Sequence, residues 1–256
     1  MSTTASPPLS GKTAIVVGAS SGIGLATALA FHDRGATVHA LARRHQLITK
    51  VAAGQIARGH FFAHSLDATD PAAVEATMTA LTGQSDVDVV VYAAGLNVPR
   101  RAVAELAPGD WDAIVRVNLS GAFYMITALL PGLRRCNGTV ILISSASARW
   151  TNVSGAAYQA SKAGLVALAA AGAHEEHVNG VRFSVLMPGV VDTPHLRRRK
   201  SLPSPQLLAN ALQPEDVAEV CLFLASLPPR AYVPELILLP TKLQAPGKTD
   251  ERIIKG

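Results

Sequence analysis

Cysteine is scarce in this chain, and no group of residues has the spacing of metal ligands. The 256 residues include only Cys136 and Cys221, each beside apolar sequence and neither in a Cys-x-x-Cys pair. The histidines do not cluster at the intervals that zinc sites use. We therefore expect no metal and no disulfide framework, and two idle thiols indicate a reducing, cytoplasmic compartment.

Concentrated charge and unbroken apolar runs are also missing. The formal charge is +5, and the basic residues are dispersed except for the run from Arg197 to Lys200. A nucleic-acid surface needs a larger basic stripe with aromatic residues beside it. We therefore interpret this run as a solvated loop, and the alternative is that it attracts an anionic substrate. The uncharged stretch from Thr13 to Phe31 is interrupted by glycines and serines, which argues against a membrane span or secretory signal.

What the chain does contain is apolar sequence, at 49% of its residues. A chain of this length and composition buries a large core, and α/β domains of this size usually remain single. We expect a flexible N-terminus over residues 1–10 and one domain over residues 11–241. The remaining tail, residues 242–256, is expected to be disordered or docked on a partner subunit.

Short β-rich runs alternate with helical runs along the chain. Seven strands are expected, at residues 13–17, 37–42, 61–64, 87–92, 139–143, 181–187 and 235–239. Helices are expected at residues 23–33, 46–57, 71–82, 111–130, 156–173 and 215–225, the third capped by Asp70. Runs 14–17, 87–91, 140–143 and 235–239 are nearly all apolar, as strands covered on both faces require. This order predicts an α/β fold: a Rossmann-like, doubly wound, seven-stranded parallel sheet flanked by helices on both faces.

A glycine-rich turn follows the first predicted strand and leads into the first helix. Glycines let the backbone turn sharply and approach a phosphate group, while the N–H groups and dipole at the helix start attract negative charge. A dinucleotide pyrophosphate fits this placement, and a plain tight turn is the alternative. The residues assigned to this site are Gly18, Ser20, Ser21, Gly22, Ile23 and Gly24.

The end of the second strand distinguishes between the two nicotinamide dinucleotides. NAD sites usually place an acidic residue there, to accept hydrogen bonds from the ribose. Here the strand ends in Ala42, Arg43 and Arg44, without a carboxylate. Arg43 offers a fork of donors to a 2′-phosphate, so NADP is preferred and NAD is less favoured. The alternative is that Arg43 and Arg44 simply begin a solvated helix.

Tyr158 and Lys162 lie four residues apart in a helical run and therefore share a helix face. A free tyrosine hydroxyl ionises near pH 10, and a neighbouring lysine cation favours the phenolate. Such a tyrosine is a candidate proton donor and acceptor at neutral pH. The alternative is an ordinary helix with a half-buried tyrosine and a solvated lysine, because this spacing is common by chance.

Further markers occur in the order and at the separations of a known family. From Lys12 to about Pro240 the chain resembles the single-domain short-chain dehydrogenase/reductase family. Besides the glycine turn, Tyr158 and Lys162, the residues that carry the resemblance are Leu66, Asp67, Ala94, Gly95, Asn118, Ser145, Pro188, Gly189, Val191 and Thr193. The ending from Val233 to Thr241 is similar to the branch that contains NADP-dependent serine 3-dehydrogenases and clavulanate dehydrogenase, which suggests small polar substrates.

The resemblance implies an NADP-dependent oxidoreductase that moves the pro-S hydride between nicotinamide and a small carbonyl or secondary alcohol. It makes Tyr158 the general acid and base, and Lys162 the residue that lowers the Tyr158 pKa and holds the nicotinamide ribose. Ser145 then binds the substrate oxygen, with Ser144 and Ser147 as competitors. Asn118 helps to keep a water that relays protons.

The same resemblance implies the remaining cofactor contacts. Leu66 and Asp67 match the pair near the adenine, and residues 188–193 match those that seat the nicotinamide carboxamide. The full set beyond the glycine turn is Arg43, Leu66, Asp67, Ala93, Ala94, Gly95, Tyr158, Lys162, Pro188, Gly189, Val191 and Thr193.

Two departures from the family pattern lie beside this site. Val17 stands where a threonine usually ties the glycine turn to the next strand, and Tyr92 and Ala93 replace two asparagines. Those asparagines would hydrogen-bond within the central sheet, so we expect a rearranged network around Tyr92. Neither departure changes the proton-transfer residues.

Three loops beyond the strand ends are expected to surround the substrate. They offer Asn97, Arg149, Trp150, Asn152 and His195 as contacts, although surface decoration is the alternative for each. The proline-rich loop over residues 195–213 is a candidate lid.

We expect a homodimer or homotetramer formed through the long helices, with no nucleic acid or membrane partner. The main competing function is a catalytically silent dinucleotide-binding sensor or scaffold. Nucleotide-sugar epimerases and dehydratases share such a fold, but those relatives usually have longer chains.

Overall fold

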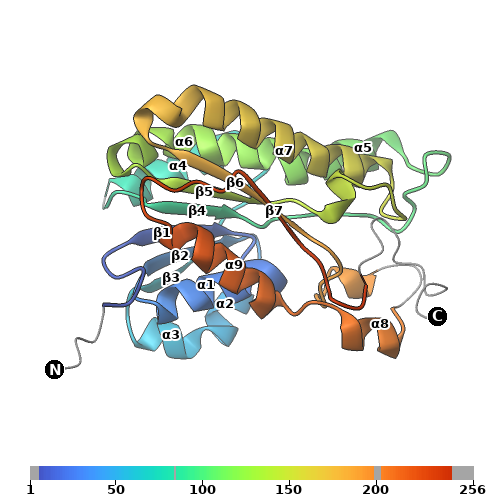
Figure 1. Ribbon diagram of the computed structural model, residues 1–256, viewed down its shortest axis with the longest axis horizontal. Coiled ribbons are helices and arrows are strands. Elements are labelled where there is room, and N and C mark those ends of the chain that lie inside the picture. The colour runs from blue at the N-terminus through green and yellow to red at the C-terminus, as the bar shows by residue number, and fades with distance from the viewer. Residues whose placement is uncertain (1–5, 84, 199–202, 244–256) are drawn as a thin grey trace.

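A single parallel sheet of seven strands organises the computed structural model, which describes residues 6–83, 85–198 and 203–243 (Figure 1). The strand order is β3-β2-β1-β4-β5-β6-β7. The strands are β1 (Thr13–Val17), β2 (Thr37–Ala42), β3 (Phe61–Ser65), β4 (Val89–Tyr92), β5 (Thr139–Ile143), β6 (Arg182–Pro188) and β7 (Glu235–Leu238). The predicted fold class is therefore confirmed.

Helices cover both faces of this sheet, in two layers (Figure 1). One apolar core lies under α4, α6 and α7, and the other lies under α1, α2 and α9. Because both faces are covered, β1 and β5 are buried at every residue. The helices are α1 (Gly22–Asp33), α2 (His45–Val51), α3 (Ala53–Ala57), α4 (Pro71–Thr82), α5 (Pro108–Val115), α6 (Gly121–Cys136), α7 (Ala156–Glu176), α8 (Pro205–Asn210) and α9 (Pro214–Ser226).

The helix predicted at residues 111–130 is longer and is not uniform. It runs from Pro108 to Cys136, and a π-helical segment over Arg116–Ser120 separates α5 from α6. Hydropathy does not reveal such a segment, because it spans only five residues, about one turn, inside a continuous helix. By length and composition the stretch Pro108–Cys136 could cross a membrane. Its buried side chains, including Met125, Leu129 and Leu133, belong to the sheet core.

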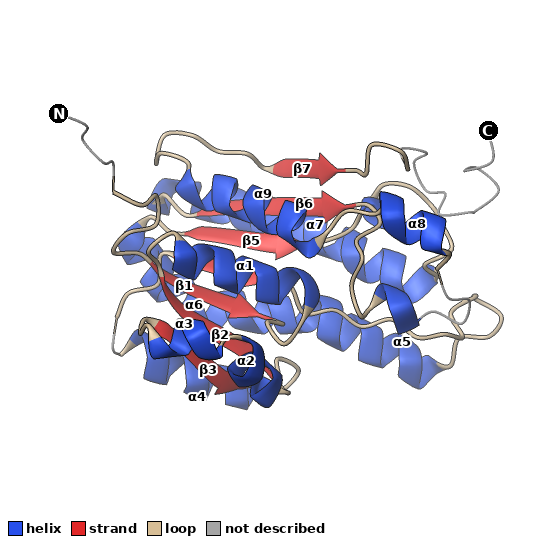
Figure 2. Ribbon diagram, turned by 90° about the horizontal axis from the view of Figure 1, so that it is seen from below, coloured by secondary structure: helices blue, strands red, loops and turns tan. Residues whose placement is uncertain are grey.

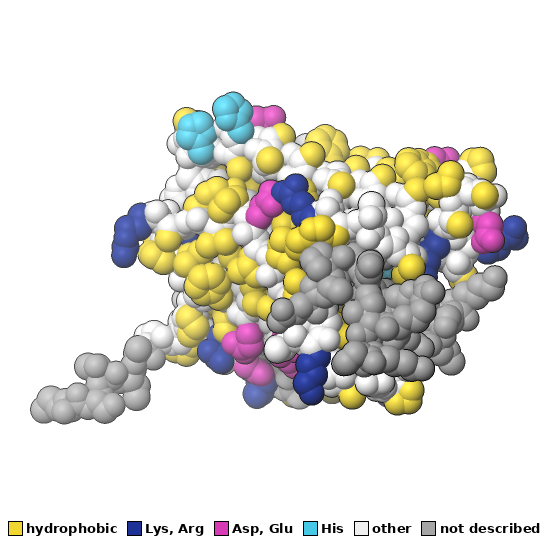
Figure 3. Space-filling model, turned by 45° about the vertical axis from the view of Figure 1, so that its right-hand side comes forward, with side chains coloured by type: hydrophobic (Ala, Val, Ile, Leu, Met, Phe, Trp, Pro, Cys, Tyr) yellow, Lys and Arg dark blue, Asp and Glu magenta, His cyan; other side chains and the backbone are white. Residues whose placement is uncertain are grey.

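Strand β7 corrects one sequence expectation. Its apolar run was predicted to be covered on both faces, but β7 is the edge strand and its residues alternate between exposed and partly buried. The exposed fractions are 40% for Ile237, 43% for Tyr232 and 50% for Phe223 of α9. Apolar side chains are frequent on the face of the molecule that includes this edge (Figure 3).

Most other helix and strand ends differ from the predictions by a few residues at most. The helix expected at residues 46–57 divides at Ala52 into α2 and α3. At the N-terminus, Leu9 is buried and its N–H donates to the carbonyl of Arg34 at 3.1 Å, so packing begins before residue 11. Asp70 caps α4 as predicted, because its carboxylate accepts from the N–H groups of Ala72 and Ala73.

The segment predicted as a lid, residues 195–213, contains regular structure that the sequence reading missed. Helix α8 begins at Pro205, and the Ser204 hydroxyl accepts a hydrogen bond from the N–H of Leu207. Leu196 and Leu207 pack with Val190 in a small apolar cluster. Arg199 and Lys200 of the basic run, and tail residues 244–256, lie outside the described residues.

The sheet also fixes where a ligand can bind. All strands point the same way, and α8 lies beyond their carboxyl ends (Figure 2). The chain order reverses between β1 and β4, so the loops that follow these two strands diverge and leave a crevice at this edge. Residues that follow β1, β4, β5 and β6 therefore meet at one place.

Candidate active site

The turn between β1 and α1 is built for close backbone approach. Gly18 has φ +85°, and a Cβ atom there would lie 2.5 Å from the backbone nitrogen of Ala94. A Cβ atom on Gly24 would lie 2.5 Å from the carbonyl oxygen of Gly18. Ser21 at the N-cap makes no side-chain hydrogen bond to α1, so the first N–H groups of this helix remain available to an anion. This geometry fits a dinucleotide pyrophosphate.

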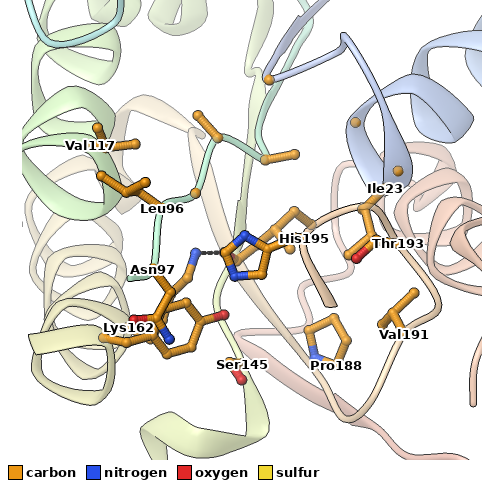
Figure 4. Close-up of a pocket in the computed structure, with 18 of the residues that line it drawn as sticks. Ile23, Leu96, Asn97, Val117, Ser145, Lys162, Pro188, Val191, Thr193 and His195 are labelled. Atoms are coloured by element: carbon orange, nitrogen blue, oxygen red, sulfur yellow. Dashed lines mark hydrogen bonds between the residues drawn. The ribbon is translucent and has the colours of Figure 1, made fainter. Parts of the chain in front are cut away.

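A cavity of about 340 Å³ extends from this turn along the carboxyl ends of the strands. Tyr158, Lys162 and Ser145 line it, as does every residue that the sequence assigned to the cofactor. Besides Tyr158 and Lys162, those cofactor residues are Gly18, Ser20, Ser21, Gly22, Ile23, Gly24, Arg43, Leu66, Asp67, Ala93, Ala94, Gly95, Pro188, Gly189, Val191 and Thr193. Several of them are labelled in Figure 4.

One end of the cavity is defined by Arg43 and Asp67. Arg43 follows β2 and is exposed, with Arg44 beside it on the cavity wall. The Asp67 carboxylate accepts hydrogen bonds from the N–H and the hydroxyl of Thr69, at 3.0 and 2.8 Å. Although burial opposes the change, these hydrogen bonds and the charge of Arg43 lower the pKa of Asp67. The Asp67 carboxylate is therefore already hydrogen-bonded within its own loop. Arg43 and Arg44 together give this end of the cavity a net positive charge.

Tyr158 and Lys162 lie on the first turns of α7. The Lys162 Nζ is 5.8 Å from the centroid of the Tyr158 ring and donates a 2.8 Å hydrogen bond to the carbonyl of Ile143, at the end of β5. Lys162 is only 4% exposed, and this burial lowers its pKa to about 8. At neutral pH it therefore remains mainly a cation, directed at the tyrosine ring.

Hydrogen bonds separate the roles of the three serines after β5. The buried Ser144 hydroxyl donates to the carbonyl of Lys162 at 2.7 Å, which ties β5 to α7. The Ser145 hydroxyl oxygen accepts from the N–H and the hydroxyl of Ser147, at 3.2 and 2.8 Å. Because both of these bonds use its oxygen, Ser145 keeps its own proton for another acceptor. Of the three, Ser145 is the best placed to donate into the cavity.

Asn118 occupies the π-helical segment and is fully buried. Its side-chain oxygen accepts from the N–H of Leu96 at 2.7 Å, and its amide donates to the Leu96 carbonyl and the Ser161 hydroxyl. The Ser161 hydroxyl in turn donates to the carbonyl of Tyr158 at 2.8 Å. Asn118 therefore fastens the loop after β4 to the first turns of α7. Among the described residues it is not part of the cavity wall, and the water relay assigned to it stays a prediction.

Three of the five predicted substrate contacts line the cavity. They are Asn97, Asn152 and His195, whose ring stacks on that of Tyr158 with centroids 6.1 Å apart. Asn97 and His195 point toward one another in Figure 4. Within the described part of the chain, Arg149 and Trp150 are not on the cavity wall, and Arg149 forms an ion pair with Glu235 of β7.

Arg101 was missed by sequence reasoning, and the hydrogen bond of Tyr92 was not specified by it. Arg101 lines the cavity from the loop after β4, and its place in that loop was the only sequence signal. Tyr92, noted only as a departure from the family pattern, is buried and donates a 2.6 Å hydrogen bond to the carbonyl of Val117. The rearranged network expected around Tyr92 thus consists of a bond to the π-helical segment.

Comparisons with known proteins agree with this architecture. The family model described as short chain dehydrogenase matches residues 12–202. The chain is 31% identical to the 3-oxoacyl-[acyl-carrier-protein] reductase of Thermotoga maritima, an alignment that covers 85% of this chain and 92% of that protein. It is 30% identical to the serine 3-dehydrogenase of Agrobacterium fabrum, over 92% of this chain and 96% of that protein.

A solved structure gives the same result in three dimensions. The alcohol dehydrogenase of the archaeon Thermococcus sibiricus, determined in complex with 5-hydroxy-NADP, superposes with a TM-score of 0.81 at 30% identity. The match covers 90% of this chain and 97% of that one.

Proposed function

The chain belongs to the short-chain dehydrogenase/reductase family, whose members are NAD(P)-dependent oxidoreductases acting on alcohol and carbonyl groups, and on that premise we propose that it interconverts a small carbonyl compound and its alcohol with NADP(H). Tyr158 is the general acid and base of this reaction. The observation that carries the proposal is that Tyr158, Lys162 and Ser145 line the same cavity as the glycine turn after β1.

The proposed mechanism divides the work among these side chains. A nicotinamide bound in the cavity supplies or accepts the hydride. Ser145 donates a hydrogen bond to the substrate oxygen and keeps its proton, and Tyr158 transfers a proton to that oxygen as negative charge develops on it. Lys162, cationic at neutral pH, favours the ionised form of the tyrosine between turnovers. In the oxidative direction Tyr158 takes the hydroxyl proton instead.

NADP is the proposed cofactor because of the charge at the Arg43 end of the cavity. In support, Arg43 and Arg44 line the same cavity as the glycine turn, and Asp67, the one carboxylate among the described residues of its wall, is engaged by Thr69. A guanidinium fork matches a phosphate dianion, whereas it offers no such pairing to the ribose hydroxyls of NAD.

Cofactor consumption against a panel of aldehydes, ketones and oxo acids tests this proposal. We expect carbonyl-dependent loss of NADPH absorbance, with kcat/KM for NADPH at least about tenfold above that for NADH, a difference that one charge-assisted hydrogen bond supplies. Tight NADPH binding without turnover of any panel member would favour the silent sensor or scaffold instead.

We also propose a homodimer or homotetramer in the cytoplasm. Both cysteines are free thiols, which suits a reducing compartment. The outer face of α7 carries the exposed small residues Ala163, Ala167, Ala170 and Ala171, and Phe123 of α6 is 51% exposed. Small residues allow close helix approach, so a second copy of this chain fits against this face. Light scattering of the purified protein, compared with an Ala167→Arg variant, measures the subunit count.

A further inference from the structure

Arg101 is held at the end of the cavity where Tyr158 lies. It belongs to the loop after β4, and its backbone and stem pack against Gly155, three residues before Tyr158. Gly155 has φ +86°, and a Cβ atom there would lie 2.5 Å from the Arg101 carbonyl oxygen and 2.7 Å from its Cβ. Asn97 of the same loop donates a 2.9 Å hydrogen bond to the carbonyl of Ser154. The loop that carries Arg101 is therefore fastened directly beside the start of α7.

The charge of Arg101 is not balanced within the described residues. No hydrogen bond or ion pair from its guanidinium is formed there, although the side chain is partly buried and lines the cavity. Arg149 and Arg197 in neighbouring loops pair with Glu235 and Asp192, so their charges are already matched. Partial burial without a partner is unfavourable for a cation, and it lowers the pKa of Arg101.

The cavity wall also offers no carboxylate near Arg101 within the described residues. Among the described residues that line the cavity, Asp67 is the sole carboxylate, and it lies at the opposite end with Arg43. The end with Tyr158 holds two cationic side chains, Arg101 and Lys162, and Lys162 is committed to the Ile143 carbonyl and the tyrosine ring. Among the described residues at this end of the cavity, Arg101 is the cation that remains available to a ligand.

We propose that Arg101 binds a carboxylate of the substrate, so that the enzyme acts on oxo acids and hydroxy acids rather than on neutral ketones and alcohols. The inference rests on the proposed function, because it names the substrate class of that same site. A guanidinium donates two parallel hydrogen bonds to the oxygens of a carboxylate in one plane, which would orient the neighbouring carbonyl toward Tyr158 and Ser145. The sequence offered the run from Arg197 to Lys200 for binding an anionic substrate. We assign that role to Arg101 instead, because Arg197 already pairs with Asp192.

Paired acid and ester substrates test the proposal. The probes are 2-oxobutanoate, 3-oxobutanoate and 4-oxopentanoate, each with its methyl ester, assayed with NADPH. We expect at least one acid to exceed its ester in kcat/KM by about tenfold to a hundredfold, the range of a charge-assisted hydrogen bond. In Arg101→Gln that ratio falls to about one, mainly through KM, and Arg101→Lys restores it only in part because a lysine lacks the fork.

A neighbouring arginine provides the matched control. Arg100 is exposed and, among described residues, outside the cavity wall, so Arg100→Gln removes the same charge one position away and keeps the wild-type ratio. The inference is overturned if the wild-type protein prefers none of the three oxo acids over its methyl ester. It is also overturned if Arg101→Gln keeps the wild-type ratio of acid to ester kcat/KM.

A binding measurement separates this inference from the proposed function. Intrinsic fluorescence of the protein saturated with NADP⁺ is titrated with 3-hydroxybutanoate and with its methyl ester. Tighter binding of the acid, lost in Arg101→Gln, supports the inference even if no carbonyl is turned over, an outcome that would defeat only the proposed function. Equal binding of acid and ester, or no binding of either, overturns the inference alone.

Discussion

The Tyr92 hydroxyl donates a 2.6 Å hydrogen bond to the carbonyl of Val117, the residue before Asn118. A π-helical turn leaves carbonyl groups without their usual intrahelical donors, and this one is satisfied from the end of β4. Tyr92 is buried, and burial together with the charge of Asp67 raises its pKa, so the hydroxyl stays protonated and remains a donor. The bond fixes the segment that carries Asn118.

Removing that hydroxyl should destabilise the protein. Tyr92→Phe leaves the Val117 carbonyl buried without its donor, and we expect the free energy of unfolding to fall by about 1–3 kcal/mol. Urea denaturation measures this change. Tyr124→Phe is the matched control, since Tyr124 forms no side-chain hydrogen bond within the described residues and should change stability by less than about 0.5 kcal/mol. Equal losses in the two variants would contradict a structural role for the Tyr92 bond.

Lys162 should make stability depend on pH in the alkaline range. Burial lowers its pKa from 10.5 to about 8, so between these values the unfolded chain binds more protons than the folded one. The free energy of unfolding therefore rises as the pH increases through this window, by a few kcal/mol at most. Denaturation of wild type and of Lys162→Met at several pH values isolates this effect as the difference between them. A difference that is constant with pH would mean that Lys162 titrates alike in both states.

Ser145 should contribute to turnover more than its neighbours do. Its hydroxyl oxygen accepts from Ser147, which leaves its proton for another acceptor. If that acceptor is the substrate oxygen, as proposed, Ser145→Ala lowers kcat by about a hundredfold, as loss of one oxyanion donor does. Ser147→Ala removes only a bond that orients Ser145 and should lower kcat by about tenfold or less. Steady-state kinetics on one substrate compares them, and a larger loss in Ser147→Ala would reverse the assignment.

Arg43 should determine the choice between NADPH and NADH. Arg43→Gln removes a guanidinium from the cavity wall, and we expect the KM for NADPH to rise by about tenfold to a hundredfold, while the KM for NADH changes little. Lys50→Gln removes a charge from the exposed side of the adjacent α2 and serves as the control. A parallel rise for both cofactors in Arg43→Gln would indicate a general loss of binding instead.

Much of this architecture could be predicted from the sequence because strands in a parallel sheet are buried on both faces. The apolar run at β1 and the glycine turn after it predict both the fold and the place of the proposed cofactor site. The edge position of β7 could not be predicted the same way, since Leu236 and Leu238 give it an apolar sequence although one side faces solvent. Strand order depends on tertiary pairing, which local composition does not reveal.

The sequence predicts which site residues lie together when they are close in the chain, and it does not when the tertiary fold brings separate loops together. Tyr158 and Lys162 share a helix turn, so their separation in sequence is enough to place them together. Arg101 and Gly155 are far apart in the chain and meet because their loops follow β4 and β5, which are neighbours in the sheet. Asn118 was named only through the family resemblance, and its bonds to Leu96 and Ser161 depend on a π-helical turn that hydropathy does not reveal.

In the proposed mechanism the Tyr158 hydroxyl exchanges the proton with the substrate. Tyr158→Phe keeps the ring that lies beneath the Lys162 Nζ and beside His195 and removes only the oxygen, so its kcat with NADPH and a carbonyl substrate is the most direct measurement. We predict a fall of about 10²–10⁴-fold, the usual contribution of a positioned general acid, with the dissociation constant for NADPH changed less than about threefold. Turnover by Tyr158→Phe at the wild-type rate would contradict the mechanism.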